Sequence, residues 1–168
     1  ILADDIYGRL VYNGNEFVPI SSLSEAIRKQ TIVINGVSKA YAMTGWRVGY
    51  AVGNPEIIAA MSKLTGQTTS NLTAVSQYAT IEALTGPQDS VETMRQAFEE
   101  RLNTIYPLLC QVPGFEVVKP QGAFYLFPNV KKAMEMKGYT DVTEFTTAIL
   151  EEVGLALITG AGFGAPEN

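Results

Sequence analysis

A lysine follows one apolar run, and an arginine precedes the next. Residues 31–34 form a β-branched, apolar run that ends in a turn at residues 35–36, and Lys39 follows it. Arg47 comes eight positions later, at the start of the apolar run 48–52. A lysine among apolar neighbours loses its proton more easily and can bond to a carbonyl carbon, and a guanidinium matches the oxygens of a phosphate. The same spacing is compatible with two solvated surface charges.

Chemistry in this chain must come from lysine, aspartate, tyrosine or an added cofactor. The sequence contains no histidine, which excludes Ser-His-Asp and Cys-His catalysis and histidine-based zinc sites. No metal site is predicted. Cys110 is the single cysteine, so no intrachain disulfide is possible, and this is a slight indication of a cytoplasmic location.

Composition indicates a globular protein with small-molecule partners. Of the 168 residues, 46% are hydrophobic and 17% are charged, and the net charge is −5. An acidic chain is a poor partner for nucleic acid or for an anionic membrane. Ile1 lies inside a predicted strand and residues 160–168 stop within a predicted loop. We therefore expect a piece of a longer protein, cut at both ends.

Three motifs point to one family. Ser38-Lys39 is followed by Gly45-Trp46-Arg47-Val48-Gly49, residues 4–7 are Asp-Asp-Ile-Tyr, and residues 121–128 are Gln-Gly-Ala-Phe-Tyr-Leu-Phe-Pro. These motifs resemble, respectively, the Schiff-base segment, a strand end and a small-domain segment of class I aminotransferases of the aspartate aminotransferase type, which depend on pyridoxal 5'-phosphate (PLP). Their order is that of the family, and they cover essentially the whole chain.

The resemblance implies the fold and its division. The expected fold is α/β: part of a PLP-dependent transferase large domain (aspartate aminotransferase-like, fold type I) plus an α+β small domain. Residues 1–88 would be the remnant of the large, PLP-binding domain. Residues 89–168 would be the small C-terminal domain, which is incomplete.

The resemblance also assigns roles to five side chains. Lys39 would form a Schiff base with PLP, and its freed amine would then act as general base and acid. Asp4 would face the pyridine nitrogen and keep it protonated. Tyr7 would donate to the phenolic oxygen of the cofactor. Arg47 and Ser38 would bind the phosphate.

Each of these assignments has a structural alternative. Asp4 could simply end a strand, and Asp5 competes for its role, although alternation along the strand directs Asp5 to the other side. Tyr7 could be an ordinary half-buried tyrosine. Some relatives place a hydroxyl three positions before the lysine, where this chain has Gly36. Tyr41 is interpreted as packing.

The function implied is transamination of an amino acid, most plausibly aspartate, with a 2-oxo acid. The full-length protein would be a homodimer, with neither nucleic acid nor membrane as a partner. The 168 residues alone are expected to be inactive, because the family's glycine-rich phosphate loop and its carboxylate-binding arginine lie outside them. Two alternatives stay open: a PLP-dependent carbon–sulfur β-lyase, and a PLP-binding effector domain of a transcription regulator.

Apolar periodicity and capping residues predict five helices. Residues 22–25 fit a capping box, and Asn71 is expected to cap a helix that turns Val75 and Tyr78 inward. Pro107 is expected to bend the longest helix. The helices are predicted over residues 23–29, 55–65, 72–85, 89–111 and 141–152.

Three strands are predicted in the C-terminal half. Residues 115–118 and 123–127 are expected to pair antiparallel around the turn at 119–122, and residues 155–159 form a last strand. The Gly160-x-Gly162-x-x-Ala165 pattern matches a dinucleotide fingerprint but lacks the helix and acidic residue that such a site needs. We interpret it as a loop.

Overall fold

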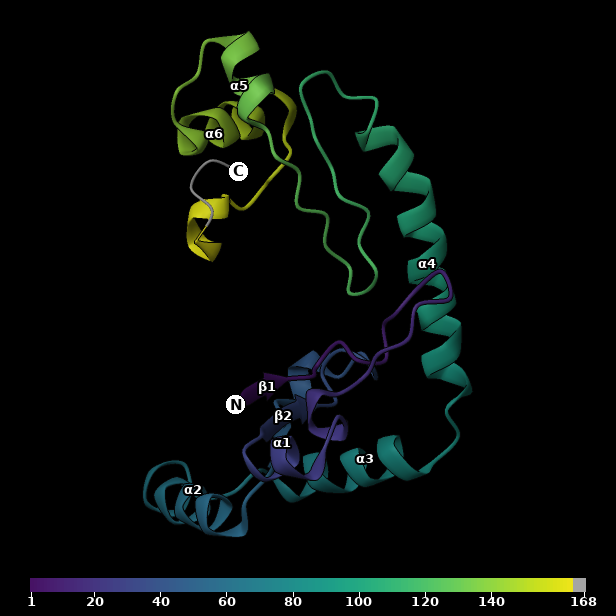
Figure 1. Ribbon diagram of the computed structural model, residues 1–168, viewed down its shortest axis with the longest axis vertical. Coiled ribbons are helices and arrows are strands. Elements are labelled where there is room, and N and C mark those ends of the chain that lie inside the picture. The colour runs from purple at the N-terminus through teal and green to yellow at the C-terminus, as the bar shows by residue number, and fades with distance from the viewer. Residues whose placement is uncertain (165–168) are drawn as a thin grey trace. The chain divides into compact units, whose positions relative to one another are not determined.

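The computed structural model describes residues 1–164, which fall into two compact units (Figure 1). The first unit contains residues 1–99 and 121–123, and the second contains residues 100–120 and continues from residue 124. Each unit is described by itself below. The correspondence of these units to a large-domain remnant (1–88) and a small domain (89–168) stays a prediction.

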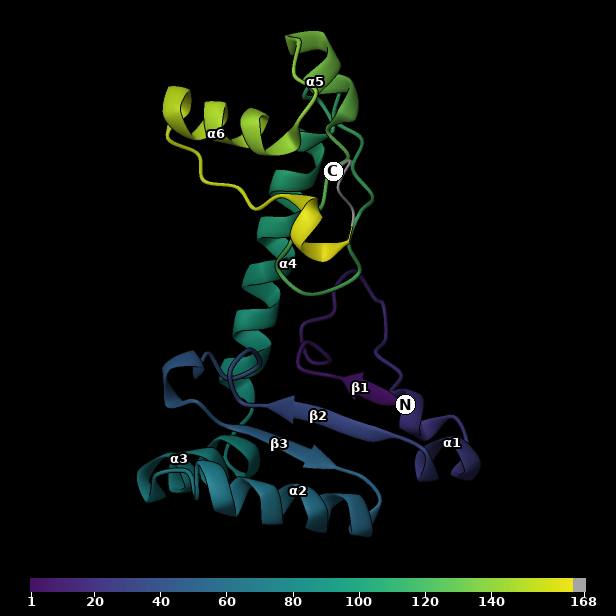
Figure 2. The same ribbon diagram turned by 90° about the vertical axis from the view of Figure 1, so that its left-hand side faces the viewer.

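A three-stranded sheet forms the centre of the first unit. Its strands are β1 (Leu2–Asp4), β2 (Ile32–Gly36) and β3 (Gly49–Val52), in the order β1-β2-β3. Figure 2 shows β2 between the other two. β1 runs parallel to β2, whereas β3 runs antiparallel to it. The β-branched run of β2 explains its place at the centre, because such side chains pack well on a pleated surface.

The helices of the first unit begin at identifiable caps. α1 (Glu25–Lys29) begins after Ser24, whose Oγ accepts the N–H of Ile27 at 3.2 Å. The predicted capping box at residues 22–25 is therefore wrong: Ser22 ends a 3₁₀ turn instead. α2 (Pro55–Thr68) follows Asn54, and a proline at its first position costs no hydrogen bond.

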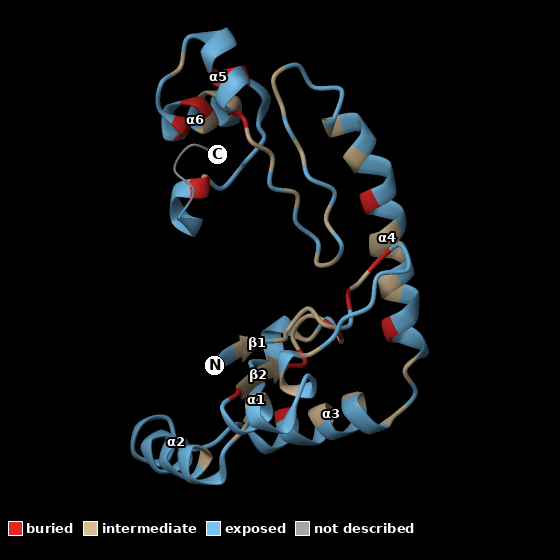
Figure 3. Ribbon diagram, viewed as in Figure 1, coloured by how far each residue is buried: buried red, intermediate tan, exposed pale blue. Residues whose placement is uncertain are grey.

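α3 (Ala74–Thr85) corrects a second prediction. Its cap is Thr73, whose Oγ1 accepts the N–H of Ser76, and not Asn71. The cap must directly precede the first helical residue, and Asn71 lies two residues too early. Val75 and Tyr78 are 68% and 74% exposed, so their predicted burial is wrong within the described residues. Figure 3 shows the same exposure along most of α2.

α4 (Asp89–Leu109) begins in the first unit and continues into the second, with Pro107 inside its last turns. Its Arg95 guanidinium donates to the carboxylates of Glu92 at 2.9 Å and Glu99 at 2.6 Å, and to the carbonyl of Val11 at 3.2 Å. The other oxygen of Glu99 accepts the backbone N–H of Asn13 at 2.7 Å. One ion-paired cluster thus fastens the turn after residue 10 to α4.

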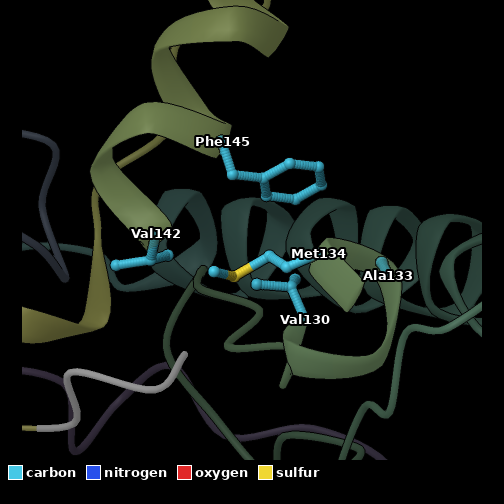
Figure 4. Packing of buried hydrophobic residues seen from close by; sticks show 5 residues of the cluster. All are labelled: Val130, Ala133, Met134, Val142 and Phe145. Atoms are coloured by element: carbon cyan, nitrogen blue, oxygen red, sulfur yellow. The ribbon is translucent and has the colours of Figure 1, made fainter. Parts of the chain in front are cut away.

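The core of the second unit lies between two short helices, α5 (Lys131–Lys137) and α6 (Val142–Val153). Its buried side chains, shown in Figure 4, are those of Val130, Ala133, Met134, Val142 and Phe145. Asp141 caps α6 by accepting two backbone N–H groups, which agrees with the predicted helix. α5 has no counterpart among the helices predicted above.

The predicted strands of the second unit do not form within the described residues. Residues 115–118 and 123–127 contribute only one antiparallel bridge nearby, between Glu116 and Asn129. Residues 155–159 are irregular and lead into a short 3₁₀ helix, Gly160–Phe163. Ala165 of the Gly-rich pattern lies outside the described residues.

Gly114 and Gly138 give a matched test of the second unit. Both have a left-handed φ, +82° and +80°. A Cβ on Gly114 would meet the backbone N of Ala133 at 2.6 Å, whereas a Cβ on Gly138 has nothing within 4 Å. We predict that Gly138→Ala costs about 1 kcal/mol from φ alone and that Gly114→Ala costs clearly more. Denaturant unfolding of both variants measures this, and equal losses would contradict the packing.

The Arg95 cluster makes a prediction about pH. The hydrogen bond from Arg95, and then that from the Asn13 N–H, lower the pKa of Glu99 below its usual 4.5. A lowered pKa in the folded state means stabilisation that is present above pH 4.5 and is lost as pH falls through the folded pKa. Glu99→Gln should therefore lower the unfolding midpoint at pH 7, with a deficit that shrinks on acidification. Glu100→Gln is the control, and a pH-independent deficit would refute the prediction.

Candidate functional site

Strand register brings the segments that carry Asp4, Lys39 and Arg47 to one edge of the sheet. Asp4, the last residue of β1, lies opposite Ile34 of β2, and Gly36 at the end of β2 lies opposite Gly49. β1 and β2 therefore end at the edge where β3 begins. Neighbouring strands are about 4.8 Å apart. The ends of β1 and β2 and the start of β3 thus lie side by side. Asp4 is at the first of these positions, Lys39 follows the second and Arg47 precedes the third.

The end of β2 packs closely against the start of β3. The predicted turn at residues 35–36 is therefore wrong, because both residues belong to β2 and pair with Tyr50 and Gly49. A Cβ on Gly36 would come within 2.7 Å of the carbonyl oxygen of Val48, so only glycine fits this approach of the two backbones. The Asn35 side chain accepts the N–H of Gly36 at 2.7 Å. Glycine at this position serves the contact between the two strands.

Lys39 lies beside Tyr7. Its Nζ is 5.6 Å from the centroid of the Tyr7 ring, within the range of a cation–π contact, and both residues are half-buried. Tyr7 belongs to a turn closed by two backbone bonds, from the N–H of Gly8 to Asp5 and from the N–H of Leu10 to Tyr7. The two residues predicted to act on the same cofactor are therefore neighbours.

Asp4 and Tyr7 line one cavity of about 250 Å³, together with residues 121–123. The N–H of Ala123 donates to the carbonyl of Leu10 at 2.8 Å, and a Cβ on Gly122 would meet that same oxygen at 2.7 Å. The motifs at residues 4–7 and 121–128 therefore meet at this cavity. Proximity of residues more than 100 positions apart in the sequence could not be inferred from their spacing.

The remaining predicted residues are placed less tightly. Arg47, at φ 55° after a 3₁₀ turn, is exposed, and its Nη1 donates to the Thr44 carbonyl at 2.8 Å. Ser38 is half-buried beside Lys39. Asp4 accepts the N–H of Ile6 at 3.2 Å, and Asp5 lines the same cavity as Asp4. The roles of Arg47 and Ser38, and the choice of Asp4 over Asp5, stay predictions.

One polar cluster beside these residues was not predicted from the sequence. The hydroxyl of Tyr41 donates to the side-chain oxygen of Gln88 at 3.0 Å, and Arg9 reaches the same oxygen at 3.4 Å. Tyr41 therefore does more than pack. The sequence offered only a faint signal: Gln88 follows the Gly-Pro pair that ends α3.

Comparison with known proteins defines the class. The family model described as aminotransferase class I and II matches residues 1–168. A crystal structure of an aspartate aminotransferase from Rhizobium meliloti superposes with a TM-score of 0.90 and 37% identity, over 97% of this chain and 42% of that one. The predicted fold class is confirmed: the chain is α/β and forms part of the fold of PLP-dependent transferases of fold type I.

The chain belongs to the family of class I and II aminotransferases. It is 80% identical over its full length to an asparagine--oxo-acid transaminase of Streptococcus mutans and 59% identical to an aspartate aminotransferase of Bacillus sp.. It spans 43% of the length of each of these relatives.

The described residues also bear on metal binding and on membrane spans. Within residues 1–164, no three His, Cys, Asp or Glu side chains are grouped as metal ligands would be. In the same part of the chain, no helix combines the length and apolar character needed to cross a membrane.

Proposed function

We propose that the protein carrying this chain transfers an amino group from an amino acid to a 2-oxo acid, with PLP as cofactor and Lys39 as the residue that forms the Schiff base. The observation that best supports this is the position of the Lys39 amine, 5.6 Å from the Tyr7 ring at the sheet edge where Asp4 and Arg47 also lie. The 168 residues alone are proposed to be inactive.

The donor set fits PLP group by group. An aldehyde needs an amine, which Lys39 supplies. A ring nitrogen that must stay protonated needs a carboxylate, which Asp4 offers from the end of β1. A phosphate needs a guanidinium and hydroxyl groups, available from Arg47 and Ser38. When bound, PLP supplies an electron sink for the bonds of the substrate α-carbon.

Lys39 has two tasks in this proposal. Its amine would hold the cofactor covalently and, once displaced by the substrate amine, would move the proton of the substrate Cα as general base and then acid. An arginine could not replace it, because a guanidinium stays protonated. The Tyr7 hydroxyl would donate to the phenolic oxygen of the cofactor and so favour a deprotonated lysine nitrogen in the lysine–cofactor link. Asp4 would hold the proton on the ring nitrogen.

Aspartate or its amide is the proposed amino donor. Two relatives are named for these substrates, an aspartate aminotransferase at 59% identity and an asparagine--oxo-acid transaminase at 80%. Both names describe transamination, which favours this reaction over β-elimination and over a regulatory effector domain. A homodimer is proposed from the family resemblance.

Replacing Lys39 tests the proposed covalent link. We predict that Lys39→Ala abolishes the imine absorbance of the holoenzyme and lowers turnover by at least about 10²-fold, because both the covalent link and the base are lost. Lys119→Ala is a close control, since Lys119 also lies over a tyrosine ring, that of Tyr106, at 5.7 Å. An unchanged absorbance spectrum in Lys39→Ala would refute the assignment.

The products identify the reaction. With 2-oxoglutarate as acceptor, the enzyme should form glutamate from aspartate or asparagine, together with the matching four-carbon 2-oxo acid. Cystathionine should yield neither pyruvate nor ammonia. Coupled assays of glutamate and pyruvate measure both outcomes. Pyruvate release from cystathionine without glutamate formation would replace transamination by the β-lyase alternative.

A further inference from the structure

Gln88 contacts both segments that carry the proposed site. It stands in the short link between α3 and α4, and its side-chain oxygen accepts the Tyr41 hydroxyl at 3.0 Å and an Arg9 N–H at 3.4 Å. Tyr41 is two residues after Lys39, and Arg9 is two residues after Tyr7. One amide oxygen therefore links the lysine segment to the tyrosine turn.

The orientation of that amide is fixed from the other side. The Gln88 Nε2 donates to the carbonyls of Ala83 at 3.0 Å and Gly86 at 2.8 Å, at the end of α3. Because both N–H groups of the amide have acceptors there, the oxygen is the atom that faces Tyr41 and Arg9. The side chain is half-buried, which strengthens hydrogen bonds relative to those in water.

A cavity of about 250 Å³ lies beside this link. It is lined in part by Arg9, Tyr41, Asn35, Gly36 and Tyr50. Residues 35–36 are the last two of β2, so the cavity adjoins the end of the strand that leads to Lys39. Sheet register fixes the end of β2, and the bond of Tyr41 to Gln88 fixes the lysine segment after Lys39.

We propose that Gln88 is a positioning residue that sets the distance between Lys39 and Tyr7. This inference rests on the proposed function, since it assigns Gln88 to the same site. Displacements of about 1 Å can change rates by up to about 100-fold, so a link of this kind matters even though Gln88 is not proposed to touch the cofactor.

The test compares Gln88→Met with Gln77→Met in the holoenzyme. Gln77 donates to the carbonyl five residues before it, that of Leu72, just as Gln88 donates to Ala83, but at the start of α3. The main readout is the pH midpoint of the lysine–cofactor absorbance. The Tyr7 hydroxyl favours the deprotonated form of the lysine nitrogen that is bonded to the cofactor. If Tyr7 is held less firmly in Gln88→Met, this pH midpoint should rise by about 0.5 to 1 pH unit. The same displacement should lower kcat about 10-fold. Gln77→Met should change neither.

Tyr41→Phe provides a milder second variant. It removes one hydroxyl and keeps the ring, so it should fold even where Gln88→Met does not. Its midpoint should move in the same direction, and the double variant should shift no further than Gln88→Met alone, because both changes break one link. Tyr12→Phe is the control, since its buried hydroxyl has no described hydrogen-bond partner.

The outcomes separate this inference from the proposed function. If the parent shows no imine absorbance at any pH, Lys39 does not hold the cofactor and the proposed function fails. If the parent titrates, and Gln88→Met and Tyr41→Phe lose thermal stability with an unchanged midpoint, the role of Gln88 is structural and the inference is overturned.

Discussion

The register of β2 against its two neighbours is the constraint on which the site depends. β1 runs parallel to β2 and β3 antiparallel to it, so two strands end where the third begins. A shift of one residue would turn every side chain of β2 to the opposite face. Gly36 makes such a shift costly, because its close approach to Val48 admits no Cβ. The edge that gathers Asp4, Lys39 and Arg47 is thus specified by backbone packing before any side chain acts.

Hydrogen bonds and ion pairs around the sheet restrain the turns that follow its strands at this edge. Residues 121–123 pair with the chain after Tyr7, the Arg95 cluster fastens residues 11–13 to α4, and Gln88 joins the tyrosine turn to the lysine segment. These links come from α4, from the link before it and from a distant loop. They are directional and partly buried, and each restrains a segment that lacks regular structure of its own. The proposed chemistry needs such restraint, because the lysine must reach both the cofactor and the substrate α-carbon.

The longer helices could be predicted from the sequence, whereas most contacts between distant segments could not. The helix predicted over 89–111 is found at 89–109, because apolar periodicity is a local property. The strands predicted at 115–118 and 123–127 were wrong, since a strand needs a partner in register and the described residues provide one bridge. The proximity of Lys39 and Tyr7 agrees with the motif-based expectation. Gln88 escaped notice because its partners lie 47 and 79 residues away.

The central claim is that the chain holds an aldehyde cofactor through one particular amine at this sheet edge. Reduction of the holoenzyme with borohydride, followed by proteolysis and mass spectrometry of the peptides, tests it most directly. We expect to find the reduced cofactor on the peptide that contains Lys39. Recovery of the cofactor on a different lysine would contradict the assignment of Lys39.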